Sequence, residues 1–203
     1  MSTDAQLKSR PSATRVRDLL SYDAETGIFS WRPRPVSEFS SARQFKTWNK
    51  RYAGKKAGKQ SSGGYLQIRF DGQAHAAHRM AWLVTYGDWP VNDIDHINGI
   101  RLDNRIANLR DVTRSENMKN VAIAKHNTSG VMGVSWMAHI ERWQAYIRVD
   151  GRRINLGYYK AIDEAASARK AAEVRYGFHP NHGRKGQMPA MTAEAAMREV
   201  SDV

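Results

Sequence analysis

Residues 93–120, DIDHINGIRLDNRIANLRDVTRSENMKN, decide the fold, because they hold an unusual density of Asn, Asp and His between well-patterned hydrophobic segments. The apolar positions predict short strands at 94–97 and 109–112, and the Asn-Gly pair at 98–99 is typical of a tight turn. A helix is expected from residue 115 onward. This β-β-α order can bring the end of the first strand close to the start of the helix. Polar residues far apart in the sequence can therefore converge there.

Four polar side chains of this segment suit phosphodiester hydrolysis. That reaction needs a base that deprotonates water, a cation that neutralises developing charge, and groups that orient both. A neutral imidazole is a competent base near neutral pH, and carboxylate and amide oxygens are hard ligands that suit Mg²⁺ or Mn²⁺. Taken singly, an Asp-His pair or an Asn near a helix start is more often a structural cap. Their joint occurrence favours a metal site with a base, and its candidates are Asp95, His96, Asn108 and Asn117.

The segment resembles the HNH endonucleases, in particular the phage homing-type subfamily with the signature DHxNGxxxDNRxxNLRxxTxxEN. Every letter of that signature is present, and the resemblance covers about residues 63–120, with a looser likeness back to about residue 15. It implies a ββα-metal fold and a single divalent ion, Mg²⁺ or Mn²⁺, bound by Asp95 and Asn117. It further implies His96 as the general base and Asn108 as the residue that braces the loop and orients the histidine.

Composition narrows the class of protein. With 203 residues, 41% of them hydrophobic, the chain is long enough for one ordinary domain or two small ones. The absence of cysteine excludes disulfides, a thiolate nucleophile and Cys-ligated zinc, which leaves oxygen and imidazole ligands for a metal. No apolar run reaches a membrane span, and the N-terminus lacks the apolar core of a secretory signal. We expect a soluble protein of the cytoplasm, that of the host cell if it is phage-encoded, with no membrane partner and no small-molecule cofactor.

The net charge of +12 favours a polyanionic partner, and its distribution is uneven. Residues 79–127 carry a net charge of only +1, whereas residues 1–78 carry +8 and residues 128–178 carry +3. Residues 32–59 hold nine basic side chains, one acid and several interleaved aromatics, a composition that suits contact with a nucleic-acid backbone. The alternative is a solvated loop whose aromatics fold onto the neighbouring core. The candidates for DNA contact here are Lys46, Lys50, Arg51, Lys55 and Lys56.

The chain before residue 93 predicts a small mixed subdomain. The pattern indicates a helix at 16–20, a strand at 27–31, a hairpin with strands at 65–70 and 73–75, and a helix at 78–86. His78 at the start of the last helix is either a core histidine or a phosphate contact, as is Arg79, and His75 has no assigned role.

Residues 128–178 form a second module. Three short β-like segments at 131–136, 143–149 and 153–158 precede a helix with a small-residue face. In the middle strand Trp143, Ala145 and Ile147 alternate toward the helix, so the residues between them face outward.

This layout, with SGVMGVSW, WQAYIRVDGRRINLGYY and DEAASARKAA, resembles the AP2/ERF-type DNA-binding domains, which lay their sheet in the major groove. Arg148 and Arg153 stand at DNA-contacting positions where that family also carries arginine. Ser135, Met137, Tyr146 and Asn155 stand where plant members carry Arg, Arg, Glu and Trp, so the plant target is not transferable. The alternative is a solvated α+β module without a ligand. The candidate DNA contacts are Arg148, Arg153, Gln144, Tyr146, Ser135 and Asn155.

The predicted fold class is α+β: a β-rich N-terminal region and a ββα-metal unit, then a small three-stranded antiparallel sheet with a helix. The expected divisions are a basic region at 1–60, the endonuclease domain at 61–125, the AP2/ERF-like domain at 128–178 and a tail at 179–203. In the tail, two histidines three residues apart favour a flexible solvated segment over a metal site. The predicted function is metal-dependent cleavage of double-stranded DNA by a monomer. The alternatives are a non-cleaving sequence-specific DNA-binding regulator and a nuclease that acts on RNA or structured DNA.

Overall fold

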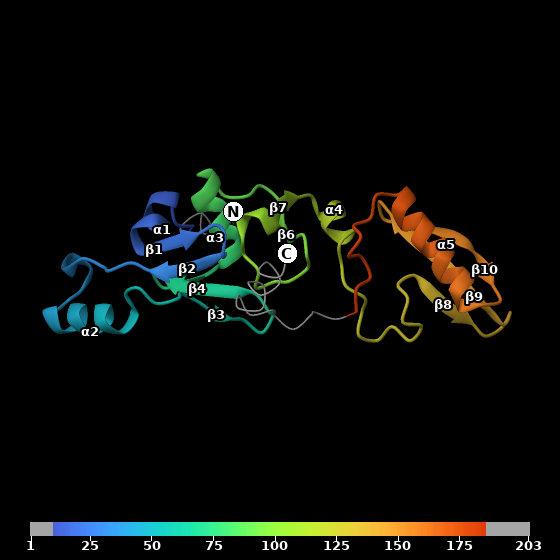
Figure 1. The fold of residues 1–203 in the computed structure, drawn as a ribbon, viewed down its shortest axis with the longest axis horizontal. Coiled ribbons are helices and arrows are strands. Elements are labelled where there is room, and N and C mark those ends of the chain that lie inside the picture. Colours follow the sequence, from blue (N-terminus) through green and yellow to red (C-terminus); the bar gives the residue numbers. More distant parts are fainter. Residues whose placement is uncertain (1–9, 186–203) are drawn as a thin grey trace, which may run out of the picture. The chain divides into compact units, whose positions relative to one another are not determined.

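A computed structural model describes residues 10–185 of the protein (Figure 1), so the Ala-rich part of the predicted tail lies outside the described residues. The chain divides into two compact units. Among the described residues, the first contains residues 10–96 together with Ile100–Asp111, and the second contains Ile97–Gly99 and residues 112–185. The segment predicted as the endonuclease domain therefore contributes to both units. The functional divisions predicted from the sequence stay predictions.

The first unit begins with helix α1 (Ala13–Leu19), whose N-cap Ser12 accepts a hydrogen bond from the Arg15 amide. Strands β1 (Leu20–Asp23) and β2 (Ile28–Trp31) follow as an antiparallel hairpin. The helix and the second strand confirm the prediction, and β1 was not predicted.

A three-stranded sheet with the order β3-β4-β5 completes the N-terminal part of this unit. Strands β4 (Leu66–Phe70) and β5 (Gln73–Ala76) join through Asp71 and Gly72, both at positive φ, as the Asp-Gly pair predicts. Strand β3 (Lys59–Gln60) is short. Helix α3 (Ala77–Tyr86) comes next and ends at Gly87, which adopts φ 92°.

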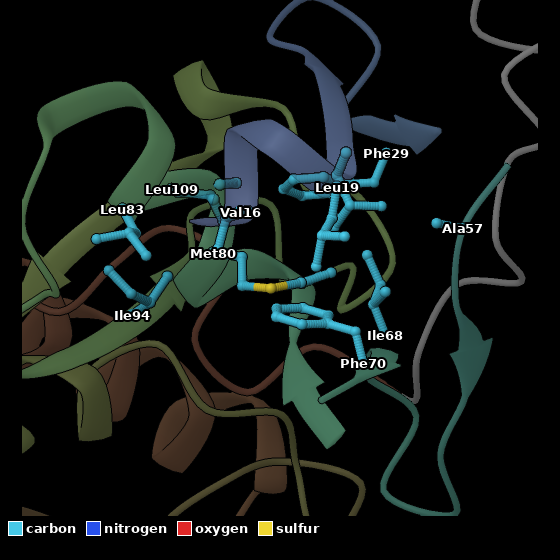
Figure 2. Packing of buried hydrophobic residues seen from close by; sticks show 13 residues of the cluster. Val16, Leu19, Phe29, Ala57, Ile68, Phe70, Met80, Leu83, Ile94 and Leu109 are labelled. Carbon is cyan, nitrogen blue, oxygen red and sulfur yellow. The ribbon is translucent and has the colours of Figure 1, made fainter. Parts of the chain in front are cut away.

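The hydrophobic core of the first unit joins α1, β2, β4 and α3 through side chains such as Leu19, Phe29, Ile68 and Met80 (Figure 2). Ile94 and Leu109 belong to the same cluster. Because each lies on a strand of the Asn- and His-rich segment, the core anchors that segment to the rest of the unit.

The Asn- and His-rich segment forms the predicted β-β-α order. Strand β6 (Asp93–His96) pairs with β7 (Leu109–Val112), and the 3-10 helix η3 (Ile106–Asn108) leads into β7. Helix α4 (Arg114–Met118) follows with a capping box, in which Thr113 and Glu116 each bond the other's backbone amide. The helix was predicted to run on from residue 115. It has only five residues and ends at Met118.

The second unit contains the predicted sheet and helix. Strands β8 (Val134–Met137), β9 (Arg142–Val149) and β10 (Arg152–Tyr159) form an antiparallel sheet in the order β10-β9-β8. Helix α5 (Ile162–Arg175) packs on it through a core that includes Val134, Ala145 and Ala165. With several small antiparallel sheets and five α-helices among residues 10–185, the α+β class is confirmed.

The described part of the tail differs from the solvated segment expected. The His179 and Gly183 amides donate hydrogen bonds to the carbonyls of Lys119 and Val121, and the Ile123 amide donates to the Arg184 carbonyl. His182 is only 8% exposed. The prediction failed because these partners lie about sixty residues away in the sequence, beyond the reach of a local pattern.

Residues 32–59 also contain an element that was not predicted. The 3-10 helix η2 (Val36–Glu38) precedes helix α2 (Ala42–Tyr52), which is capped by Ser41 and contains no buried residue. Figure 1 shows α2 at the edge of the first unit, away from α1. Trp48 of α2 packs against Trp31 at the end of β2. None of the helices within residues 10–185 is both long and apolar enough to cross a membrane.

Candidate active site

Strand β6 places Asp95 and His96 side by side in the chain, and both are buried. Nε2 of His96 lies 3.2 Å from Oδ1 of Asn104. Because an amide oxygen can only accept, a hydrogen bond at this contact requires the imidazole proton on Nε2, and in that tautomer the basic lone pair is on Nδ1. Burial lowers the pKa of His96, although the bond to Asn104 opposes that shift. The imidazole is therefore neutral at pH 7.

Asn104 is the residue of this site that sequence reasoning missed. Asn104 is 1% exposed, and its Nδ2 donates to the Leu102 carbonyl. The backbone carbonyl of Asn104 accepts a hydrogen bond from the Tyr22 hydroxyl. Gly27, at φ 71°, lies so close that a Cβ there would be 2.5 Å from the Asn104 carbonyl carbon. The β1-β2 hairpin therefore holds Asn104 in place. Asn104 is part of the signature found in the sequence, which was a signal that it matters. The spacing alone did not distinguish its role from that of Asn108.

Asn108 braces the same loop. Its Nδ2 donates to the Asp103 carbonyl at 2.9 Å, and its amide donates to the Arg105 carbonyl at 2.9 Å. Asp103 also forms an ion pair with Arg105. Bracing agrees with the role predicted for Asn108, and Asn104 supplies the hydrogen bond to His96 described above. The catalytic role of Asn108 stays a prediction.

Asp95 receives two hydrogen bonds from a second strand. Nε and Nη2 of Arg110, on β7, lie 2.9 and 2.7 Å from the same oxygen, Oδ2. The Asp95 side chain is 8% exposed, so the guanidinium supplies the positive charge that a buried carboxylate requires. Arg110 therefore fixes the orientation of the carboxylate, and a metal ion bound by Asp95 would have Arg110 as a neighbour.

A ring cluster surrounds His96. The ring of His78 packs edge-on at 5.2 Å, and Tyr65 lies 5.1 Å from His78 and 6.0 Å from His96. Burial, with the positive charge of neighbours, lowers the pKa of His78 to about 3. This buried, neutral environment favours the core alternative for His78. Arg79 donates to two backbone carbonyls, a structural role.

The donor chemistry fits a hard divalent ion. The predicted ligands are the carboxylate of Asp95 and the amide oxygen of Asn117, which is half-buried on α4 in the second unit. No group of three His, Asp or Glu side chains within residues 10–185 has metal-site geometry. Mg²⁺ commonly binds through one or two protein oxygens and keeps several waters, so this small set suits it. The ligand assignment stays a prediction.

The sheet of the second unit brings the six predicted DNA contacts onto one face. Residues directly opposite each other in an antiparallel sheet share a face. The strand register gives three rows across the sheet: Ser135 with Gln144 and Tyr158, Tyr146 with Asn155, and Arg148 with Arg153.

A hydrogen-bond network covers this face. The amide nitrogen of Gln144 donates to Asn155 and Tyr158, and its oxygen accepts from Arg153 at 2.9 Å. The Arg153 guanidinium lies over the Tyr146 ring, 3.8 Å from the centroid. Gln144 is consequently only 8% exposed, unlike the open outward residue expected, because longer neighbours cover it. Arg148 is exposed.

The basic candidates of the N-terminal region are exposed on α2 and on the loop after it: Lys46, Lys50, Arg51, Lys55 and Lys56. The acid of this region, Glu38, forms ion pairs with Arg15 and Arg34, and Arg15 holds the pKa of that carboxyl below its usual range. Its charge is therefore compensated within the fold.

Comparisons with known proteins find a family match that contains Asp95, His96 and Asn104. A family model described as HNH endonuclease matches residues 75–119. Protein 3.8 of Escherichia phage T7 is 34% identical over 84 residues, a match that covers 41% of this chain and 69% of the phage protein. No solved structure matches significantly. The chain therefore belongs to the family of phage protein 3.8, and its residues 75–119 form an HNH endonuclease domain.

Proposed function

We propose that the protein is a metal-dependent DNA endonuclease of the homing type that hydrolyses phosphodiester bonds with His96 as general base. The observation that carries the proposal is the pair of His96 and Asn104 inside the segment that matches the HNH family. A buried neutral imidazole whose Nε2 proton is already held presents Nδ1 as its proton acceptor. That is the state required of a general base at neutral pH.

In the proposed reaction, Nδ1 of His96 takes a proton from a water molecule. The water oxygen forms a bond to phosphorus, the bond from phosphorus to the 3′ oxygen breaks, and that oxygen leaves with a proton from solvent. The products are a 5′-phosphate and a 3′-hydroxyl. A divalent ion, Mg²⁺ or Mn²⁺, held by Asp95 and Asn117, would neutralise charge on the phosphate and on the leaving oxygen. Arg110 acts as a positioning residue, since it fixes the Asp95 carboxylate.

We further propose that the C-terminal sheet binds double-stranded DNA, as the AP2/ERF resemblance implies. Arg148 and Arg153 share a face with polar side chains that can bond base edges. Arg153 is held in place by Gln144 and Tyr146, which reduces the side-chain entropy lost on binding. The exposed lysines near α2 would contact phosphates independently of sequence.

A plasmid assay tests the proposal. We expect the wild type to convert supercoiled plasmid into open-circular or linear DNA in the presence of Mg²⁺. The control variant His139→Ala, a change at an exposed histidine of the second unit, should do the same. His96→Ala should convert it about 10²- to 10⁴-fold more slowly. Indistinguishable products from the wild type and His96→Ala would refute the proposal. Sequence-specific duplex binding without cleavage would instead support a DNA-binding regulator, and a strong preference for RNA would support a nuclease of another class.

A further inference from the structure

Helix α2 carries a groove of about 450 Å³ for which the proposed cleavage reaction has no use. Its lining includes three aromatic residues, Phe39, Trp48 and Tyr52, which we call the aromatic wall. Arg43 and Arg51 also line the groove. The volume lies within the range of roughly 300–1,000 Å³ that is usual for small-ligand sites.

The helical repeat produces this arrangement. Residues four apart on a helix are neighbours on its surface, so Trp48 and Tyr52 form one ridge, and Arg43 and Arg51 lie along the next ridge with Thr47 between them. At 1.5 Å per residue, the two arginines are about 12 Å apart along the axis. The groove therefore lies along an aromatic ridge of α2 and a neighbouring ridge that carries two arginines.

The aromatic wall is not part of the main core. Trp48, which packs edge-on against Trp31 at 5.5 Å, makes its other ring contacts with Phe39 and Tyr52, at 6.0 and 5.3 Å. Among these rings the core cluster includes only Trp31 at its margin. Tyr52 remains 36% exposed. An exposed ring beside two half-buried rings in a groove favours a ligand with a flat apolar face.

The charge of the surroundings identifies the class of ligand. Residues 39–59 contain seven Lys or Arg and no Asp or Glu. Arg51 lies over the Tyr52 ring at 5.4 Å, so one cation is already held at the aromatic wall. An apolar peptide needs no such cations. A nucleotide presents a flat base together with an anionic phosphate, which suits the aromatic wall and the arginines beside it.

We propose that this groove binds one unstacked nucleobase of DNA against Trp48 and Tyr52, with Arg43 and Arg51 on the flanking phosphates. The inference uses the proposed function only in taking DNA as the ligand. Thr47 and Gln44, which also line the groove, offer polar groups to the base edge. Since a base inside a duplex cannot enter, the protein binds DNA with an exposed single-stranded stretch more tightly than continuous duplex.

Binding of the full chain, in EDTA to prevent cleavage, tests the proposal. Fluorescence anisotropy would compare a continuous duplex with the same duplex interrupted by a short single-stranded gap that contains 2-aminopurine. The variants are Trp48→Leu and the milder Tyr52→Leu. Tyr86→Leu is the matched control, because Tyr86 is 58% exposed in the same unit and stacks on Trp82 outside the groove. Circular dichroism would verify that each variant folds.

We expect the wild type and Tyr86→Leu to prefer the gapped DNA and to quench the 2-aminopurine fluorescence. Each groove variant should lose about tenfold in affinity for gapped DNA, with a change of less than about twofold on duplex. Equal affinity of the wild type for both DNAs, or equal losses on both DNAs in Tyr52→Leu, would overturn the proposal. Because no cleavage is measured, these outcomes are independent of whether His96 is a general base.

Discussion

Replacement of Asn104 by alanine tests the proposed tautomer of His96. The side chain of Asn104 accepts the Nε2 proton at 3.2 Å in a position that is 1% exposed. Its removal leaves a buried donor without that acceptor, which costs about 1–3 kcal/mol of the free energy of unfolding. The imidazole then loses the contact that keeps Nδ1 unprotonated. A misoriented base retains part of its effect, so we expect cleavage to slow by about 10- to 100-fold, less than in His96→Ala.

Three measurements separate this effect from simple destabilisation. Urea unfolding gives the stability loss, cleavage of supercoiled plasmid gives the rate, and ¹⁵N NMR of the histidine rings reports which nitrogen carries the proton. Asn127→Ala is the matched control, because Asn127 accepts from the Gly130 amide and donates to the Val131 carbonyl in the second unit. It should lose comparable stability and keep the rate. A folded Asn104→Ala protein that cleaves at the wild-type rate would refute the reasoning.

Three further predictions concern stability. Gly27→Ala should lower the free energy of unfolding in urea by more than Gly151→Ala does, with a difference of more than about 1 kcal/mol. Both glycines have positive φ, but of the two only Gly27 is so close to backbone that a Cβ would lie 2.4 Å from the Arg105 nitrogen. Equal losses would contradict that packing. Glu173→Ala should cost about 3–5 kcal/mol, because it leaves the 4% exposed Arg169 without its ion pair, and a thermal midpoint close to wild type would argue against it. Burial lowers the pKa of His182 to about 4 from 6.5, so the unfolded chain binds the proton first and stability falls as pH drops from 6.5 toward 4. His182→Gln should flatten that decline in pH-dependent melts, and an unchanged slope would assign it to other groups.

Local signals predicted the parts of the fold whose chemistry is local. The Asp-Gly pair at 71–72 fixes a hairpin because its backbone adopts positive φ, and Gly87 ends α3 for the same reason. The β-β-α order around Asp95 and His96 was predicted from short apolar runs and a turn, and the structure adds a capping box at the start of its helix. In each case the decisive residues lie within a few positions of the element that they define.

Long-range contacts account for what could not be predicted. Asn104 owes its place to Tyr22 and Gly27, about eighty residues earlier, so no spacing near His96 distinguishes it. Helix α2 was missed because its apolar residues serve a ring cluster outside the main core, among many cations. Gln144 lies on the predicted face, but its cover by Arg153 and Tyr158 depends on the cross-strand register.

Several acidic side chains of the endonuclease domain form ion pairs or hydrogen bonds within the fold. Asp95 forms an ion pair with Arg110, and Asp103 forms one with Arg105. The Asp111 carboxylate accepts hydrogen bonds from the backbone amides of Val91 and Asn92. These acids shape loops and strands, and the cations that match them leave the domain little net charge with which to attract DNA. Residues 39–59 contain seven basic residues and no acid. Glu38, just before them, is compensated by Arg15 and Arg34. The proposed function thus assigns cleavage chemistry and attraction to DNA to different segments, and we expect a change in α2 to alter which DNA is bound without altering the proposed base, His96.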